Sequence, residues 1–212
     1  MVITVEDVRS LYGEADSVHD FDHILRVLAV AERIAVSEGA DLSIVRAAAL
    51  LHDWGRAEAQ AEGHDHAGVA AVRADRYLRE RGVPDSEVTA ICHAIRAHRF
   101  RAAPVPTTLE AKVLFDADKL DAIGALGVAR AYAYGGAHNQ RLWAPVETVD
   151  LARWKADGDN VEEHTPVHEF VVKLSRIHGQ LYTHEGRRIA EERHRYMVGF
   201  FERLDAEVRG EL

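Results

Sequence analysis

The stretch RAAALLHDWGRAEAQ, residues 46–60, joins an apolar run directly to a titratable pair. Residues 47–51 are all apolar, and His52 and Asp53 follow them without a break. An ionised carboxylate away from water must be paired with a charge or bound to a cation. The stretch therefore predicts a buried helix that ends at a polar site.

Apolar residues recur at three- and four-residue spacing along most of the chain, which is typical of helices that pack on one face. We expect helices over residues 22–38, 42–53, 66–81, 86–99, 107–121, 170–179 and 184–208. Thr107 followed by Glu110 forms a capping-box pattern that would open the fifth of these helices. The strand-like runs VITV and KVLF are too short to build a sheet, so the predicted fold is all-α.

Composition limits the classes of protein that the chain can represent. Its 212 residues fit a single domain over 1–212, and the net charge of -9 argues against bulk nucleic acid as a partner. Cys92 is the single cysteine, and neither a signal peptide nor a membrane-length apolar run is visible. We therefore expect a cytoplasmic protein with no membrane partner, and the sequence leaves open whether it forms a homodimer.

Polar residues on the apolar faces of the predicted helices are the candidates for metal binding or catalysis. His23, His52, His98 and Asp118 each continue an apolar stripe, and Asp121 follows one turn after Asp118. A lone histidine in such a place is more often a core residue bonded to a carbonyl. Several such groups on different helices are better explained by a divalent metal ion. The His-Asp pair alone is weak evidence, because it occurs three times in this chain.

Three segments resemble the HD-domain metal-dependent phosphohydrolases, in particular the small bacterial branch that includes nucleotide pyrophosphohydrolases. These segments are HDFDHILRV at 19–27, LLHDWGR at 50–56 and LFDADKLDAIGALGVAR at 114–130. AYAYGG at 131–136 and GRRIAEERHRYMVGFFERL at 186–204 are similar to that branch too. The resemblance implies a compact helical HD fold with a C-terminal helical extension over 165–208, and signature motifs within 19–121. Gly55-Arg56 departs from the commoner Gly-Lys of the family.

The resemblance also implies a ligand set for one divalent ion, which would be Mn, Co, Ni, Fe, Mg or Zn. The implied ligands are His23, His52, Asp53 and Asp118. Such an ion lowers the pKa of its water and polarises phosphorus, and Asp53 could orient the attacking water as general base.

Other residues near these motifs are candidates for supporting roles. Arg26 and Lys119 could neutralise phosphate charge, although both could equally be solvated basic side chains. His66 and His98 would contact substrate or orient a ligand, and Asp121 would accept a hydrogen bond from a ligand histidine.

Residues 132–164 show no sustained periodicity, and a loop of this length is usually functional or disordered. The segment places aromatic residues beside cations: Tyr134, Trp143 and Trp154 with Arg141, Arg153 and Lys155. They could stack a base and hold phosphates, or the tryptophans could simply pin the loop to the helices.

The leading functional hypothesis is a metal-dependent phosphohydrolase that acts on a small phosphorylated substrate. A nucleotide is the favoured substrate, cleaved at a phosphomonoester or pyrophosphate bond. The alternatives are a phosphodiesterase acting on a cyclic or linear diester, and a non-catalytic sensing or scaffold domain whose metal is structural.

Overall fold

The computed structural model describes residues 3–12, 21–99, 103–148 and 164–212, and in these residues it contains helices and no strand. The predicted all-α class is confirmed. The chain groups into two compact units. The first unit comprises Met1–Leu120 with Leu181–Gly186, and the second comprises Asp121–Gln180 with Arg187–Leu212. A single domain over 1–212 stays a prediction.

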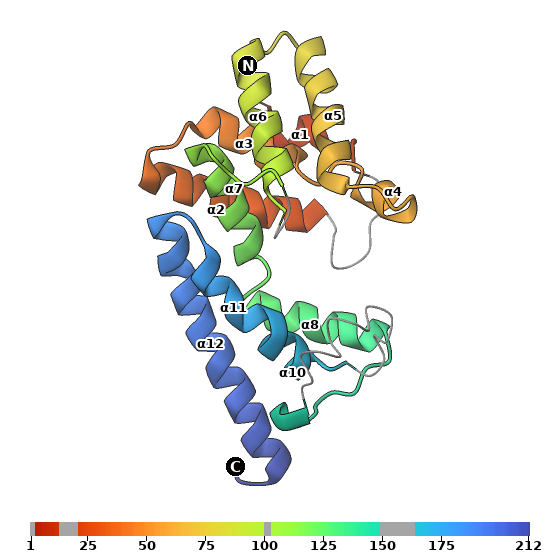
Figure 1. The fold of residues 1–212 in the computed structure, drawn as a ribbon, viewed down its shortest axis with the longest axis vertical. Helices are drawn as coiled ribbons and strands as arrows, with labels where there is room; N and C mark the ends of the chain where they lie inside the picture. The colour runs from red at the N-terminus through yellow and green to blue at the C-terminus, as the bar shows by residue number, and fades with distance from the viewer. Residues whose placement is uncertain (1–2, 13–20, 100–102, 149–163) are drawn as a thin grey trace. The chain divides into compact units, whose positions relative to one another are not determined.

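The helices of the first unit account for the apolar periodicity of the first half of the chain (Figure 1). They are α1 (Val5–Arg9), α2 (Phe21–Glu38), α3 (Leu42–Leu51), α4 (Arg56–Ala61), α5 (His66–Glu80), α6 (Asp85–Ala97) and α7 (Leu109–Leu120). Helix α2 packs against α3 and α7, while α6 packs against α5, α3 and α7. Their inward faces form a core that includes Ile24, Ile34, Leu51, Ile95 and Leu114, all at most 2% exposed.

The start of α7 differs from the prediction by one residue. Thr108, not Thr107, caps the helix, because its hydroxyl accepts the backbone N–H of Ala111 at 3.2 Å. Glu110 is not the second half of a capping box, since its carboxylate accepts the backbone N–H of Asp41 at 3.2 Å. Asp41 in turn caps α3. The acid therefore ties the beginnings of two helices together, which a local motif cannot reveal.

Helices α1, α4 and α8 (Ala125–Ala137) were not predicted from the periodicity. Helix α1 begins inside the strand-like run VITV, because Thr4 and Asp7 form a reciprocal capping box there. Helix α4 is only one and a half turns long. Helix α8 includes the first six residues of the segment 132–164, so the expectation of irregular chain was wrong there. Its three glycines, Gly127, Gly135 and Gly136, lower helix propensity without breaking the helix.

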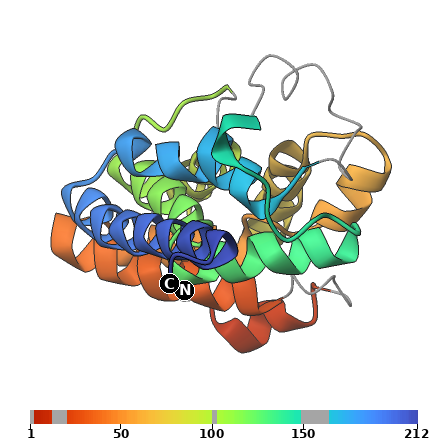
Figure 2. The same ribbon diagram turned by 90° about the horizontal axis from the view of Figure 1, so that it is seen from below.

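The second unit contains the remaining helices that the structure describes, except for the first three residues of α12. They are α8, η1 (Val146–Thr148), α10 (Pro166–Glu169), the π-helical turn η3 (Phe170–Leu174), α11 (Ser175–Ile177), η4 (His178–Gln180) and α12 (His184–Arg209). Phe170 stacks on Phe201 of α12 with ring centroids 4.3 Å apart. Figure 2 shows α12 beside the shorter helices of residues 166–180.

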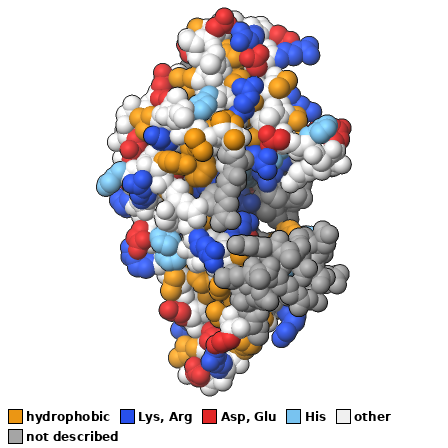
Figure 3. Space-filling view, in the orientation of Figure 1, with side chains coloured by type: hydrophobic (Ala, Val, Ile, Leu, Met, Phe, Trp, Pro, Cys, Tyr) orange, Lys and Arg blue, Asp and Glu red, His pale blue; other side chains and the backbone are white. Residues whose placement is uncertain are grey.

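Charged side chains of both signs are interspersed on the face drawn in Figure 3. This mixture is as expected for a chain with 26 basic and 35 acidic residues. None of the helices that the structure describes has the length and apolar character needed to cross a membrane.

Asp116 on α7 is a buried anchor for residues 181–186. Its fully buried carboxylate accepts the backbone N–H groups of Tyr182 and Thr183, at 2.9 Å and 2.7 Å, and the Thr183 hydroxyl at 2.6 Å. These bonds supply the partners that a buried carboxylate needs. A side chain at Gly186 would meet both Thr183 and Asp116, so this close packing needs glycine there.

Replacing Asp116 with alanine should lower the free energy of unfolding by about 3 kcal/mol or more, because three donors, two of them buried, lose their acceptor. Urea denaturation of wild type and variant measures this difference. The matched control is Asp75→Ala, which removes an exposed carboxylate bonded to Arg79 on the surface of α5 and should cost less than about 1 kcal/mol. Equal effects of the two substitutions would contradict the anchoring role.

Candidate metal centre

Six side chains of the kinds that can bind a metal ion meet in the first unit, and most of them lie at helix ends. His23 lies in the first turn of α2, and Asp118 in the last turn of α7. His52 and Asp53 directly follow α3, His66 is the first residue of α5, and His98 directly follows α6. Helix ends bring side chains of distant segments to one place without interrupting the packing of the apolar faces.

The backbone fixes two of these imidazoles in the same way. His52 Nδ1 lies 2.8 Å from the carbonyl oxygen of Ala49, and His98 Nδ1 lies 2.6 Å from that of Ile95. Because a carbonyl only accepts, Nδ1 must be the donor in each ring. The lone pair of each Nε2 is therefore available, which is the tautomer that a metal ligand requires.

Asp53 lies at the middle of this group. Its Oδ2 is 3.7 Å from Nε2 of both His23 and His52, and its Oδ1 is 3.7 Å from Nε2 of both His66 and His98. These separations are too long for hydrogen bonds. Two ligands that each lie about 2.1 Å from one cation are themselves about 3–3.5 Å apart, so the spacing is close to that of a ligand shell.

The donor atoms fit a divalent metal in number and kind. Suitably placed ligand atoms of His23, His52 and Asp118 lie within 4.8 Å of one another, and so do those of Asp53, His66 and His98. His52 Nε2 and Asp53 Oδ1 are buried and have no hydrogen-bond partner among the described residues. Buried polar atoms without a partner are costly unless an ion satisfies them. Imidazole with carboxylate suits first-row transition metals and zinc.

Both carboxylates of the predicted ligand set also hold a cation. Arg56 Nη1 donates to Asp53 Oδ2 at 2.6 Å, and Lys119 Nζ donates to Asp118 Oδ2 at 2.6 Å. The other oxygen of Asp118 faces His23 Nε2 at 3.5 Å. Each pair is a charge-assisted hydrogen bond that holds its carboxylate in one orientation.

Burial and these charges set the protonation states of the imidazoles and carboxylates at the site. Burial lowers the pKa of His98 to about 3, and it also lowers the pKa values of His52 and His66, so these imidazoles are neutral near pH 7. Burial alone would raise the pKa of Asp53, but His52 and Arg56 outweigh it and lower that pKa. Burial would also raise the pKa of Asp118, but Lys119, His23 and His98 together outweigh it and lower that pKa well below its usual value. The site therefore holds neutral imidazoles and ionised carboxylates, the forms that bind metal.

Comparison with known proteins places this site in a family. Residues 20–123 match the family model described as the HD domain. The chain is 31% identical over 207 residues to the uncharacterized protein YpgQ of Bacillus subtilis, an alignment that covers 96% of this chain and 91% of YpgQ. The chain belongs to the HD-domain family.

Solved structures of relatives have a similar fold. The crystal structure of Bacillus subtilis YpgQ in complex with ADP has a TM-score of 0.72 at 29% identity, covering 98% of this chain and 99% of that one. A Bacillus thuringiensis HD-superfamily hydrolase has a TM-score of 0.75 at 30% identity, covering 97% and 94%. The HD fold predicted from the sequence is confirmed, and this HD-domain protein is a metal-dependent phosphohydrolase.

The structure brings His23, His52, Asp53 and Asp118 together, as the predicted ligand set requires. It also places His66 and His98 at the same distance from Asp53 as the predicted ligands. Geometry around Asp53 therefore does not separate ligands from supporting histidines, and their roles stay predictions.

Other predicted residues lie as follows. Asp121, in the second unit, accepts a hydrogen bond from Arg130 Nη1 at 2.9 Å, and its predicted contact with a ligand histidine stays a prediction. Arg26 is half-buried on α2, one turn after His23. In the segment 132–164, Tyr134 stacks on His138, Trp143 is half-buried and Arg141 is exposed. Arg153, Trp154 and Lys155 lie outside the described residues.

Sequence reasoning missed two residues at the HD pair. Arg56 lies three residues after Asp53, so helical spacing together with opposite charge could have indicated the contact. Tyr12 donates from its hydroxyl to the Leu50 carbonyl at 2.7 Å, at the end of α3. Because burial and Asp53 raise the pKa of Tyr12 well above its usual value, its hydroxyl keeps its proton. No local signal links residues 12 and 50.

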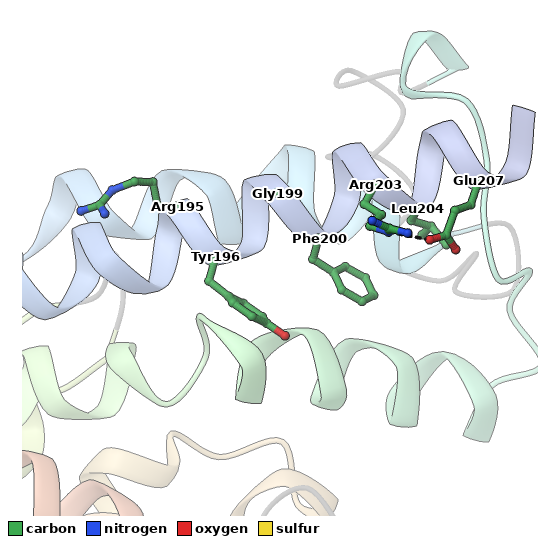
Figure 4. Close-up of a pocket in the computed structure, with 7 residues that line it drawn as sticks. All are labelled: Arg195, Tyr196, Gly199, Phe200, Arg203, Leu204 and Glu207. Atoms are coloured by element: carbon green, nitrogen blue, oxygen red, sulfur yellow. Dashed lines mark hydrogen bonds and ion pairs between the residues drawn. The ribbon is translucent and has the colours of Figure 1, made fainter. Parts of the chain in front are cut away.

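A separate groove of about 480 Å³ lies on α12 in the second unit. Tyr196 and Phe200 point from α12 toward α8, and Arg203 is paired with Glu207 (Figure 4). Its lining contains no histidine, and its one carboxylate is already bound. The groove therefore lacks the ligands that metal-dependent hydrolysis needs.

Metal analysis tests the predicted ligand set. Elemental analysis after reconstitution should give close to one divalent ion per chain, and Asp118→Ala should lose most of it because an ion ligand is removed. The matched control is Asp121→Asn, three residues on, which should retain most of the metal. Full occupancy in Asp118→Ala would contradict the set, and two ions per chain would place a second ion at Asp53, His66 and His98.

The stability of the metal-free protein should fall with acid. The folded pKa of His98 is about 3, whereas an unfolded histidine titrates near 6.5. Between these values the unfolded chain binds a proton that the folded chain excludes, so stability rises with pH in this window.

Thermal unfolding in chelator at pH 7, 6 and 5 measures this dependence. His98→Asn should flatten it, since the buried imidazole is gone. His64→Asn is the control, because His64 has a side chain that is 60% exposed. An unchanged slope in His98→Asn would show that His98 is not the group responsible.

Proposed function

We propose that this HD-domain phosphohydrolase acts on nucleoside diphosphates or triphosphates. The proposal rests mainly on the charge balance of the site. The charges of Asp53 and Asp118 are offset by Arg56 and Lys119, which lie 2.6 Å away. The charge of a bound divalent ion would therefore stay uncompensated by these four residues, and an anionic substrate of high charge would supply the balance.

The charge of the substrate separates the candidate reactions. A phosphodiester carries one negative charge per phosphate, whereas a terminal phosphate carries about -1.5 to -2 at pH 7. Polyphosphates add further charge, so they match the site better than a diester does. The Bacillus subtilis relative YpgQ was crystallised in complex with ADP, which also favours a nucleotide.

We assign different roles in the proposed reaction to the residues of the site. Asp53 holds and orients the reacting groups from the centre of the four imidazoles, while Lys119 and Arg56 are placed to donate to phosphoryl oxygens. Arg56 Nε is buried without an acceptor among the described residues, so a further donor is available. A divalent cation, when bound, polarises the phosphoryl group and makes water a better nucleophile.

The partial exposure of one end of the site favours catalysis over a structural role for the metal. A structural site is normally closed, with every coordination position filled by the protein. Here Lys119 and Asp118 remain partly accessible, with side chains 14% and 13% exposed. A substrate phosphate could therefore approach the last turn of α7, which carries Asp118 and Lys119.

A release assay over several substrates tests the proposal. Phosphate and pyrophosphate release should be measured from ATP, ADP and nitrophenyl phosphate, and AMP formation from cyclic AMP, with Mn, Co, Ni and Mg added in turn. We expect kcat/KM for ATP or ADP to exceed that for nitrophenyl phosphate and cyclic AMP by about tenfold or more, because the cationic site favours polyanions.

Asp53→Asn should remove activity on every substrate, which controls for contaminating phosphatases. A preference for cyclic AMP would instead identify a phosphodiesterase. Lack of turnover with all four substrates and all four metals would favour a non-catalytic domain.

A further inference from the structure

The two ion pairs at the metal centre place positive charge beside the predicted ligands. Each carboxylate of the predicted ligand set is bonded to a cation that follows it closely in sequence, Arg56 after Asp53 and Lys119 after Asp118. A site designed only to retain a divalent ion would keep positive side chains away, because they repel the ion.

Burial makes these pairs strong. The side chains of Asp53 and Asp118 are 5% and 13% exposed, and those of Arg56 and Lys119 are 24% and 14% exposed. Water and salt screen charges in such surroundings much less than they screen surface pairs. The contacts at 2.6 Å are also shorter than most neutral hydrogen bonds.

We propose that Arg56 and Lys119 are built-in counter-ions of the metal site that weaken metal binding and couple it to the binding of phosphate. With the site free of metal, the two cations neutralise the carboxylates and keep them in place. When a metal ion binds, the site gains excess positive charge. An anionic phosphate relieves this excess, so metal and phosphate bind more tightly together than either binds alone.

The proposal rests on the proposed ligand set of His23, His52, Asp53 and Asp118, and the two can fail separately. Loss of metal in Asp118→Ala tests the ligand set. The affinity of variants that keep all four ligands tests the counter-ions.

The experiment measures the dissociation constant of Mn²⁺ from the electron paramagnetic resonance signal of the free ion, at constant pH and ionic strength. Arg56→Met and Lys119→Met remove one charge each and keep most of the side-chain volume. Each should bind Mn²⁺ more tightly than wild type, by about tenfold or more. Each should also bind inorganic phosphate more weakly in the presence of Mn²⁺.

Three controls isolate charge from packing. Arg56→Lys and Lys119→Arg keep the charge and should stay within about threefold of wild type. Arg76→Met removes a cation that is 83% exposed on α5 and should change nothing. Unchanged or weaker Mn²⁺ binding in both methionine variants would overturn the proposal.

A measurement on the wild-type chain does not depend on the folding of any variant. Saturating inorganic phosphate should tighten Mn²⁺ binding, and by thermodynamic linkage Mn²⁺ should tighten phosphate binding by the same factor. Absence of this coupling in the wild-type chain would also overturn the proposal.

Discussion

The hydrogen bond from an imidazole Nδ1 to a helix-end carbonyl is the constraint on which the metal centre depends. His52 and His98 both make it, to the carbonyls three residues earlier in α3 and α6. The bond satisfies a carbonyl that the helix leaves without a partner, and it also selects the tautomer that presents Nε2. The same kind of bond therefore occurs at the ends of two helices and leaves the Nε2 atoms of two imidazoles available as acceptors.

The remaining groups depend on the packing of the same helices. Helix α2 carries His23 and packs against α3 and α7, which carry His52 and Asp118 toward it. Because apolar faces set the relative positions of these helices, the polar donors at their ends need not contribute favourably to folding by themselves. The core thus stabilises a cluster of neutral imidazoles and ionised carboxylates that would be costly without a bound ion.

Charge is balanced within short segments of this site. Arg56 and Lys119 are each within three residues of the carboxylate that they neutralise. Membership of the HD-domain family accounts for the metal-dependent hydrolase activity. The cations beside the predicted ligands bear on a different property, the affinity of this chain for its metal ion. Arginine at position 56 offers several donors in a fixed plane, so it can hold Asp53 and still present N–H groups to a phosphate.

The sequence by itself determined the helical class, most helix positions and the residues of the HD motifs. Apolar spacing follows from the period of a helix, and His23, His52, Asp53 and Asp118 interrupt that pattern where a core should be apolar. Tertiary structure alone decided the contacts between distant segments. Asp116 binds residues 182 and 183, Glu110 binds the backbone of Asp41, and Tyr12 binds Leu50. Hydrogen bonds of this kind leave no periodic trace in the chain, because they depend on how the helices pack.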